Sequence, residues 1–299
     1  MSRRSPLKSR PLCGILLGGL SSGFIANALR VTSDRTPPVR TALFQLDAFA
    51  SRLFAGNPAA VMPLETFPSD AVLQAVAAEN NLAETAFLIR QGDDYRIRWF
   101  TPTIEVALCG HATLASAAVV MERLEPGRER VVFHSASGPL TVGRSNAGYV
   151  MNFPARPSMP VPTPPGLVEA LGVVPCEVVA DATNYLVLLE TAQVVRELAP
   201  DITAIGRLER SGVIVTGPGD GKFDFVSRYF APAKGIPEDP VTGSAHCALA
   251  PYWAQRLNKR EFLAYQASPR GGEIICRCVH DRVELEGTVV FYLEGTAQI

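Results

Sequence analysis

The chain has 299 residues, of which 47% are hydrophobic, and a formal net charge of −1 at pH 7. This length allows roughly two domains with buried cores. The near balance of charge, with no Lys/Arg cluster beyond the first ten residues, argues against a nucleic-acid binder and favours small-molecule partners.

Residues 1–40 are predicted to form a leader outside the fold. Arg3, Arg4 and Arg10 precede an apolar, glycine-rich run, and no acid appears before Asp34, which loosely imitates a targeting peptide. The apolar run is far shorter than the roughly 20 residues that a membrane span needs. The segment is therefore either unstructured or a targeting sequence, and no membrane association is expected.

A first lobe is predicted over residues 41–155. A helix is expected to begin near Ser69-Asp70, which can cap it, and to end at Asn80-Asn81. A second, alanine-rich helix is predicted from His111 to about Glu122. The expected strands are 43–49, a run following Gly56-Asn57-Pro58, 82–89, 95–100, 130–133, 140–142 and 149–153.

A proline-rich linker separates this lobe from a second one at residues 156–299. Six prolines fall within Pro154–Pro165, a density that excludes a central strand or a helix. Helices are predicted from Leu167 and from Ser244. The expected strands of the second lobe are 177–179, 185–189, 212–216, 223–230, 272–279, 282–287 and 289–293, of which the last could pack back on the first lobe.

One pattern occurs twice in the chain. Arg98-Trp99-Phe100-Thr101-Pro102 leads to Gly110-His111-Ala112, and Arg228-Tyr229-Phe230-Ala231-Pro232 leads to Gly243-Ser244-Ala245. The two strands are 130 residues apart and the two turns 133, so the second copy carries a three-residue insertion. Each turn presents the free N–H groups of a helix start to one spot, where a small anion could bind. The repeat predicts an α+β fold with two pseudo-symmetric lobes, each a mostly antiparallel sheet around a central helix.

Together these motifs resemble those of the phenazine-biosynthesis isomerase-like, or PhzF-like, family. The resemblance rests on Gly56-Asn57-Pro58, Asn81 to Phe87, Trp99 to Pro102 with Cys109 to Thr113, and Glu238 to Ala245, and it runs from about Thr41 to the C-terminus. It implies a diaminopimelate epimerase-like fold with the active site between the lobes, and a homodimer.

Glu84 is the first candidate for chemistry. A carboxylate within the apolar run Leu82–Ile89 is desolvated, which suits a group that takes and returns a proton. The alternative from the residues alone is a carboxylate at a strand end that faces solvent or pairs with an arginine. The resemblance implies that this glutamate is the acid/base.

Two further candidates lie beside the second turn. The resemblance carries Asp239 over as a residue that orients substrate or assists proton transfer, whereas an acid before Pro240 is otherwise a turn former. Ser244 could hold a substrate carboxylate or act as a plain N-cap.

His111 occupies the equivalent place in the first turn. It is either a cap or a neutral imidazole that relays a proton. The predicted substrate-binding residues of the two lobes are Gly110, Gly243, Asn57 and Thr242.

No metal or cofactor is expected. His134 and His280 lack metal-ligand spacing, and no GxGxxG sequence opens a βαβ unit. The six cysteines contain no pair of CxxC motifs, and Cys276 and Cys278, two apart on one strand face, are interpreted as buried small hydrophobes. These features suit a reduced, cytoplasmic protein.

The sequence thus predicts a cofactor-independent isomerase that moves a proton on a small anionic, carboxylate-bearing metabolite. One alternative is an epimerase or racemase with two opposed bases. Cys109 precedes Gly110 as a catalytic thiol would, but Thr242 occupies the equivalent place before Gly243. The other alternative is a non-catalytic binding or scaffold protein on the same fold.

Overall fold

Two sets of strands with the same order and sense of pairing build the fold, in a computed structural model that describes residues 39–299. Residues 1–38 of the predicted leader lie outside the described residues, whereas Arg40 already belongs to β1, so the fold begins slightly before the predicted boundary. In sheet order the first set is β17 (Val289–Gln298), β1 (Arg40–Ala48), β2 (Asn57–Leu64), β3 (Glu84–Gln91), β4 (Asp94–Phe100), β6 (Arg130–Ser135), β7 (Gly138–Ser145) and β8 (Gly148–Pro154). The second is β9 (Met159–Pro160), β10 (Glu177–Ala180), β11 (Asn184–Leu188), β12 (Gly212–Pro218), β13 (Phe225–Phe230), β14 (Glu261–Gln266), β15 (Gly272–Val279) and β16 (Arg282–Gly287).

The pairing repeats from one set to the other. Neighbours are antiparallel except at β2–β3 and β4–β6 in the first set and at β11–β12 and β13–β14 in the second. An antiparallel β8–β16 pair joins the sets, and β5 (Glu105–Val106) adds to β4. The repeat in the sequence is therefore a repeat of sheet topology.

One strand returns to the first set. β17 follows β16 in the chain but pairs with β1, whereas β9 pairs with β10 within the second set. Residues 38–299 pack as one compact unit. The division into residues 41–155 and 156–299 stays a prediction.

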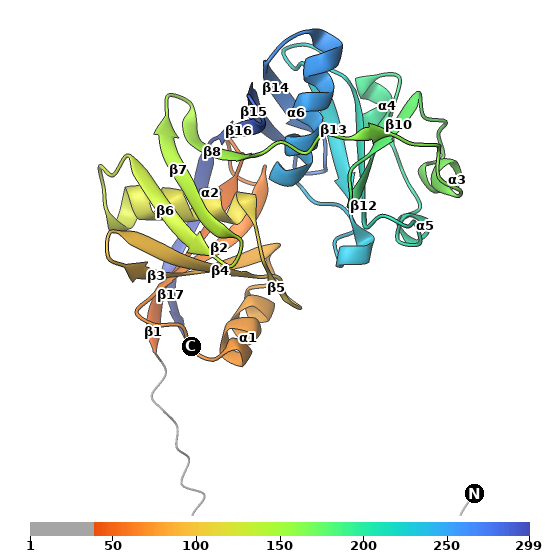
Figure 1. Cartoon of the computed structure of the whole chain (residues 1–299). Helices are drawn as coiled ribbons and strands as arrows, with labels where there is room; N and C mark the ends of the chain where they lie inside the picture. Colours follow the sequence, from red (N-terminus) through yellow and green to blue (C-terminus); the bar gives the residue numbers. More distant parts are fainter. Residues whose placement is uncertain (1–38) are drawn as a thin grey trace, which may run out of the picture. The chain divides into compact units, whose positions relative to one another are not determined.

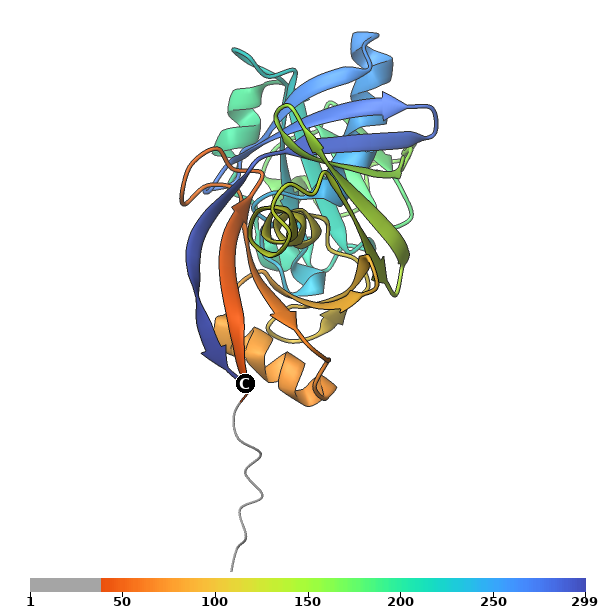
Figure 2. The same cartoon turned by 90° about the vertical axis from the view of Figure 1, so that its left-hand side faces the viewer.

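Each lobe surrounds a helix. These central helices are α2 (Gly110–Val119), continued by the π-helical turn η1 (Val120–Leu124), and α6 (Gly243–Leu257). Every α2 residue from His111 to Val119 is buried, as expected for a helix enclosed by sheet, and Figure 2 views this helix nearly end-on within its strands. Figure 1 shows the two helices in their separate sets of strands. The α+β class predicted from the sequence is confirmed.

Shorter helices cover the remaining apolar surface. They are α1 (Asp70–Asn80), α3 (Leu167–Leu171), α4 (Ala192–Glu197), α5 (Ile202–Ile205) and the 3₁₀ turn η2 (Pro232–Lys234). α1 ends as predicted, with Asn81 in the left-handed conformation, but the Ser69 side chain makes no capping hydrogen bond. Within residues 39–299, no helix is long and apolar enough to cross a membrane.

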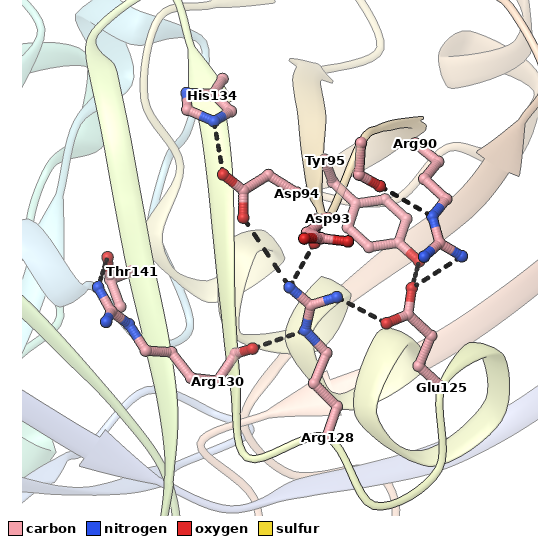
Figure 3. Close-up of polar contacts among 10 residues, drawn as sticks. Arg90, Asp93, Asp94, Tyr95, Glu125, Arg128, Arg130, His134 and Thr141 are labelled. Atoms are coloured by element: carbon pink, nitrogen blue, oxygen red, sulfur yellow. Dashed lines mark hydrogen bonds and ion pairs between the residues drawn. The ribbon is translucent and has the colours of Figure 1, made fainter.

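The helix predicted from His111 to about Glu122 continues through the π-helical turn η1 to Leu124, and a polar network around Glu125 follows it. Glu125 donates its backbone N–H to Val120, five residues back, and its carboxylate accepts from Tyr95 at 2.6 Å and from Arg128 at 2.6 Å. The Tyr95 bond and then the Arg128 charge lower the pKa of Glu125. Arg128 also donates to the carbonyls of Asp93 and Arg130, so the turn is held against β4 and β6 (Figure 3).

Candidate active site

The two glycine-led turns open onto one cavity of about 510 Å³. α2 and α6 contact each other, and their first residues, Gly110 and Gly243, both line the cavity. An ideal Cβ at Gly243 would approach only Leu285, at 3.4 Å, and one at Gly110 would meet nothing closer than 3.9 Å. Both glycines stand at a helix start, where the first backbone N–H groups have no partner within the helix and can bind an anion.

Most of the predicted site residues meet at this cavity. The lining includes Glu84, His111, Asp239, Thr242 and Ser244. Ser244 is exposed and is the second residue of α6, since the N-cap position belongs to Thr242. Likewise the N-cap of α2 is Cys109, which leaves His111 inside the first turn. The capping alternatives for Ser244 and His111 do not describe this structure.

Glu84 stands at the first position of β3. Its carboxylate is 8% exposed, and Oε2 lies 3.1 Å from Nε2 of His111. The two atoms are close but poorly aligned, and neither makes a well-formed hydrogen bond within residues 39–299. A buried carboxylate oxygen and a ring nitrogen that lack well-formed hydrogen bonds can interact with substrate atoms, and the carboxylate can take a substrate proton.

His111 is fixed by a second set of contacts on its other ring nitrogen. Nδ1 lies 3.2 Å from the amide nitrogen of Asn57 and 3.5 Å from Sγ of Cys109. Burial alone lowers the pKa of the imidazole, but the neighbouring Cys109 sulfur and Glu84 carboxylate raise it well above its ordinary value. A carboxylate 3.1 Å away thus opposes the preference for a neutral imidazole expected from the helix dipole.

Asp239 is held by donors on both carboxylate oxygens. Oδ1 accepts from the Asn57 amide at 2.7 Å and Oδ2 from the Thr242 hydroxyl at 2.5 Å. Desolvation raises the pKa of Asp239 to about 6; the charge of His111 opposes this rise and that of Glu84 adds to it. A carboxyl that titrates near neutrality beside a cavity is suited to proton chemistry.

Asn57 connects the two lobes behind these groups. Besides Asp239, its amide nitrogen donates to the carbonyl of Val241 at 2.9 Å, and the side chain is fully buried. Gly56 makes the approach possible: its φ is +66°, and a Cβ there would lie 2.2 Å from the carbonyl oxygen of Ala48. Asn57 is not among the residues that line the cavity, so its position suits holding Asp239 and His111 in place.

Sequence reasoning missed four polar residues of the cavity wall and one behind it. Thr101, Arg156, Tyr229 and Lys234 line the cavity. The buried Gln266 accepts from the backbone N–H of Thr242 at 2.8 Å and donates to the carbonyl of Asp239 at 2.7 Å. The sequence feature that could have identified Lys234 as a cavity residue is its position in the loop that carries the three-residue insertion.

Glu84, Cys109 and His111 are close enough to suggest a metal site, but the ring orientation argues against one ion. Their potential ligand atoms lie within 4.8 Å of one another. Glu84 approaches Nε2 of His111, whereas Cys109 approaches Nδ1, on the opposite side of the ring. A single ion bound at the usual distances of about 2.0–2.3 Å would not reach both partners through one imidazole nitrogen.

Comparison with known proteins decides the family. The family model for phenazine biosynthesis-like proteins, PhzC-PhzF, matches residues 46–295. The chain belongs to the phenazine biosynthesis-like family. A Pseudomonas aeruginosa protein named as an uncharacterized isomerase is 51% identical over 85% of this chain and 97% of its own length. The chain is accordingly an enzyme of the isomerase class.

Solved structures agree with this assignment. A PhzF-family protein of Enterococcus faecalis has a TM-score of 0.85 and 42% identity, and the match covers 87% of this chain and all of that one. A hydroxyproline epimerase of Agrobacterium vitis has a TM-score of 0.54 at 10% identity, over 87% and 93% of the two chains, which shows a shared fold alone. PhzF-like proteins and such epimerases therefore share one architecture.

Proposed function

We propose that this enzyme shifts a proton on a small carboxylate-bearing metabolite, with Glu84 as the acid/base and no cofactor. The observation that carries the proposal is the buried Glu84 carboxylate, 3.1 Å from the His111 imidazole in a cavity that both helix starts enter. A charged imidazole stabilises the carboxylate and can donate to an oxygen on which charge develops. The helix starts would hold the substrate carboxylate and fix the reacting carbon near Glu84.

Exchange of substrate hydrogen with solvent tests the reaction class. In D₂O, the enzyme should incorporate deuterium at a carbon atom of a true substrate. The incorporation is monitored by NMR for a panel of small unsaturated carboxylates that includes a dihydro-hydroxyanthranilate. The product should be a positional isomer. If a dilute substrate is converted completely and neither the product nor the recovered substrate contains deuterium, the proton on the base does not exchange with solvent. That result would argue against the proposed base.

Anion binding at the turns gives a separate prediction. Gly243→Val should weaken binding of a carboxylate ligand by about 10-fold or more, because the γ-methyl groups obstruct the backbone N–H groups of α6. The fold should survive, since the Cβ position is nearly open. Calorimetric titration with benzoate measures the effect, with Gly295→Val on the exposed β17 strand as the matched control. Equal affinity in wild type and both variants would limit the turns to a structural role.

An epimerase is the second candidate, because epimerases share this fold and Cys109 stands beside the site. Burial, and then the Glu84 charge, raise the pKa of the Cys109 thiol, and burial raises that of Cys247 to about 12. Neither thiol is activated as a base in the way that two-thiol epimerisation requires.

We therefore expect Cys109→Ala to keep most of the activity and iodoacetamide to inhibit weakly. The measurement is turnover of the variant together with a chiral analysis of the product. Loss of turnover in folded Cys109→Ala, accompanied by inversion at a substrate stereocentre in the wild type, would favour the epimerase.

We further propose a cytoplasmic homodimer, which family membership supports. The cysteines of the described residues are free thiols, as in proteins of reducing compartments. Sedimentation equilibrium of the purified chain tests the dimer.

A further inference from the structure

The cavity wall is asymmetric where the two lobes differ in sequence. In the second lobe the loop after β13 carries the three-residue insertion and forms η2, which ends at Lys234 before Gly235 with a φ of 80°. In the first lobe the equivalent loop contributes Ile104, Val106 and Leu108 to the cavity. Counted from Pro102 and Pro232, one lobe therefore places Lys234 where the other places Ile104, whereas Ile236 matches Val106.

Lys234 lacks a carboxylate partner. Within residues 39–299, no carboxylate oxygen lies within 4.0 Å of its ammonium group, which donates to the Tyr229 hydroxyl at 2.9 Å. That hydroxyl donates onward to Asn184 at 3.0 Å. Since an ammonium group has three donors, the remaining N–H bonds of Lys234 are available at the cavity wall.

Arg156 adds a second cation to the same wall. Its Nε lies 3.4 Å from Asp181, and Nη2 donates to Thr183 at 2.9 Å. Asp181 is already occupied, because one of its oxygens accepts the backbone N–H groups of Thr183 at 2.7 Å and Asn184 at 2.6 Å. Asp181 therefore pairs with Arg156 and leaves Lys234 without a direct carboxylate partner among the described residues. Burial and then the Arg156 charge lower the pKa of Lys234, and the more distant Asp181 and Asp239 charges oppose this.

Part of the cavity lining is apolar. Ile104 is 55% exposed and Leu108 is 44% exposed, and the buried Phe153 also lines the cavity. Aliphatic and aromatic side chains in a cavity lining favour a ligand with an apolar or planar body. Such a ligand would lie between these side chains, the two helix starts and the cationic wall.

We propose that Lys234 and Arg156 form a second anion subsite, which selects substrates that carry a carboxylate in addition to the one held at the helix starts. The inference deepens the proposed function and rests on it for the first carboxylate. The preferred substrate class is then a compact dicarboxylate with an unsaturated or cyclic body. Charge-assisted hydrogen bonds to such a group contribute about 1.5–3 kcal/mol each, which corresponds to roughly 10-fold to 100-fold in affinity.

Simple aromatic acids test this subsite by calorimetry at low ionic strength. Benzoate carries one carboxylate, and isophthalate and terephthalate add a second at two different spacings. Wild type should bind at least one dicarboxylate about 10-fold more tightly than benzoate. Lys234→Met should reduce that preference to within about 2-fold and leave benzoate affinity unchanged, whereas Lys234→Arg should retain it.

Lys222→Met is the matched control, because Lys222 pairs with Glu273 away from the cavity, and it should behave as wild type. Three results would overturn the proposed subsite. The preference for a dicarboxylate could persist in Lys234→Met, the wild type could bind benzoate and the dicarboxylates equally well, or neither dicarboxylate could bind at millimolar concentration. These binding readouts do not depend on turnover. A Glu84→Gln variant with normal activity would therefore refute the proposed mechanism and leave the subsite result standing.

Discussion

Glu84→Gln is expected to lower kcat/KM by about 10²-fold to 10⁴-fold while the protein stays folded. Glutamine keeps the shape of the side chain but cannot take a proton from carbon. The loss should appear in kcat as well as in kcat/KM, because the interaction concerns proton transfer and not only substrate binding. The stability cost should be small, since Oε2 of Glu84 makes no well-formed hydrogen bond within the described residues.

The measurement is turnover together with the rate of deuterium incorporation from D₂O. Glu294→Gln is the matched control, because Glu294 pairs with Arg123 at the surface, on β17. The control should retain wild-type rates and the Glu84 variant should lose exchange and turnover in parallel. A Glu84→Gln enzyme that still exchanges substrate hydrogen at nearly the normal rate would assign the base to another residue, with Asp239 as the nearest candidate.

The duplicated motif predicted more of the fold than any single segment did. Two strand, loop and helix units at nearly constant separation imply two similar lobes, and the structure has α2 and α6 in repeated sheets. Strands with alternating or continuous apolar patterns were also located well; β15 and β16 begin and end at the predicted residues. Local periodicity was sufficient there because both strands are bounded by turns.

Predictions were weaker where distant parts of the chain decide the outcome. β14 was missed: it pairs in parallel with β13, and Gln266 at its end reaches Asp239 and Thr242. The continuation of β17 to Gln298 was also missed, since its pairing with β1 spans almost the whole chain. Such contacts leave no periodic signal in the segment itself.

The charge of His111 is a similar case. The helix start was visible in the sequence and favours a neutral imidazole. The Glu84 carboxylate, which opposes that preference, approaches from β3 only in the folded chain. Lys234 and Arg156 escaped notice for the same reason, because isolated cations in loops are usually solvated.

Asp239→Asn is expected to remove the acid limb of the pH profile. With a pKa raised to about 6, mainly by desolvation, Asp239 loses its proton as the pH rises through that value. We expect the ionised form to be the active one, because both of its oxygens accept hydrogen bonds, from Asn57 and from Thr242. In wild type, kcat/KM should therefore rise between about pH 5 and pH 7.

Asparagine cannot reproduce this arrangement. Its NH₂ group would face either the Asn57 amide, which is a donor, or the Thr242 hydroxyl, which would have to turn from donor to acceptor. Asparagine also lacks the negative charge beside His111. The expected loss at pH 7.5 is about 10²-fold or more in kcat/KM, and the limb near pH 6 should vanish. Asp70→Asn, at an exposed position on α1, should show the wild-type profile. A folded Asp239→Asn enzyme that keeps the limb near pH 6 would show that another group titrates there, and Asp239 would then only position its neighbours.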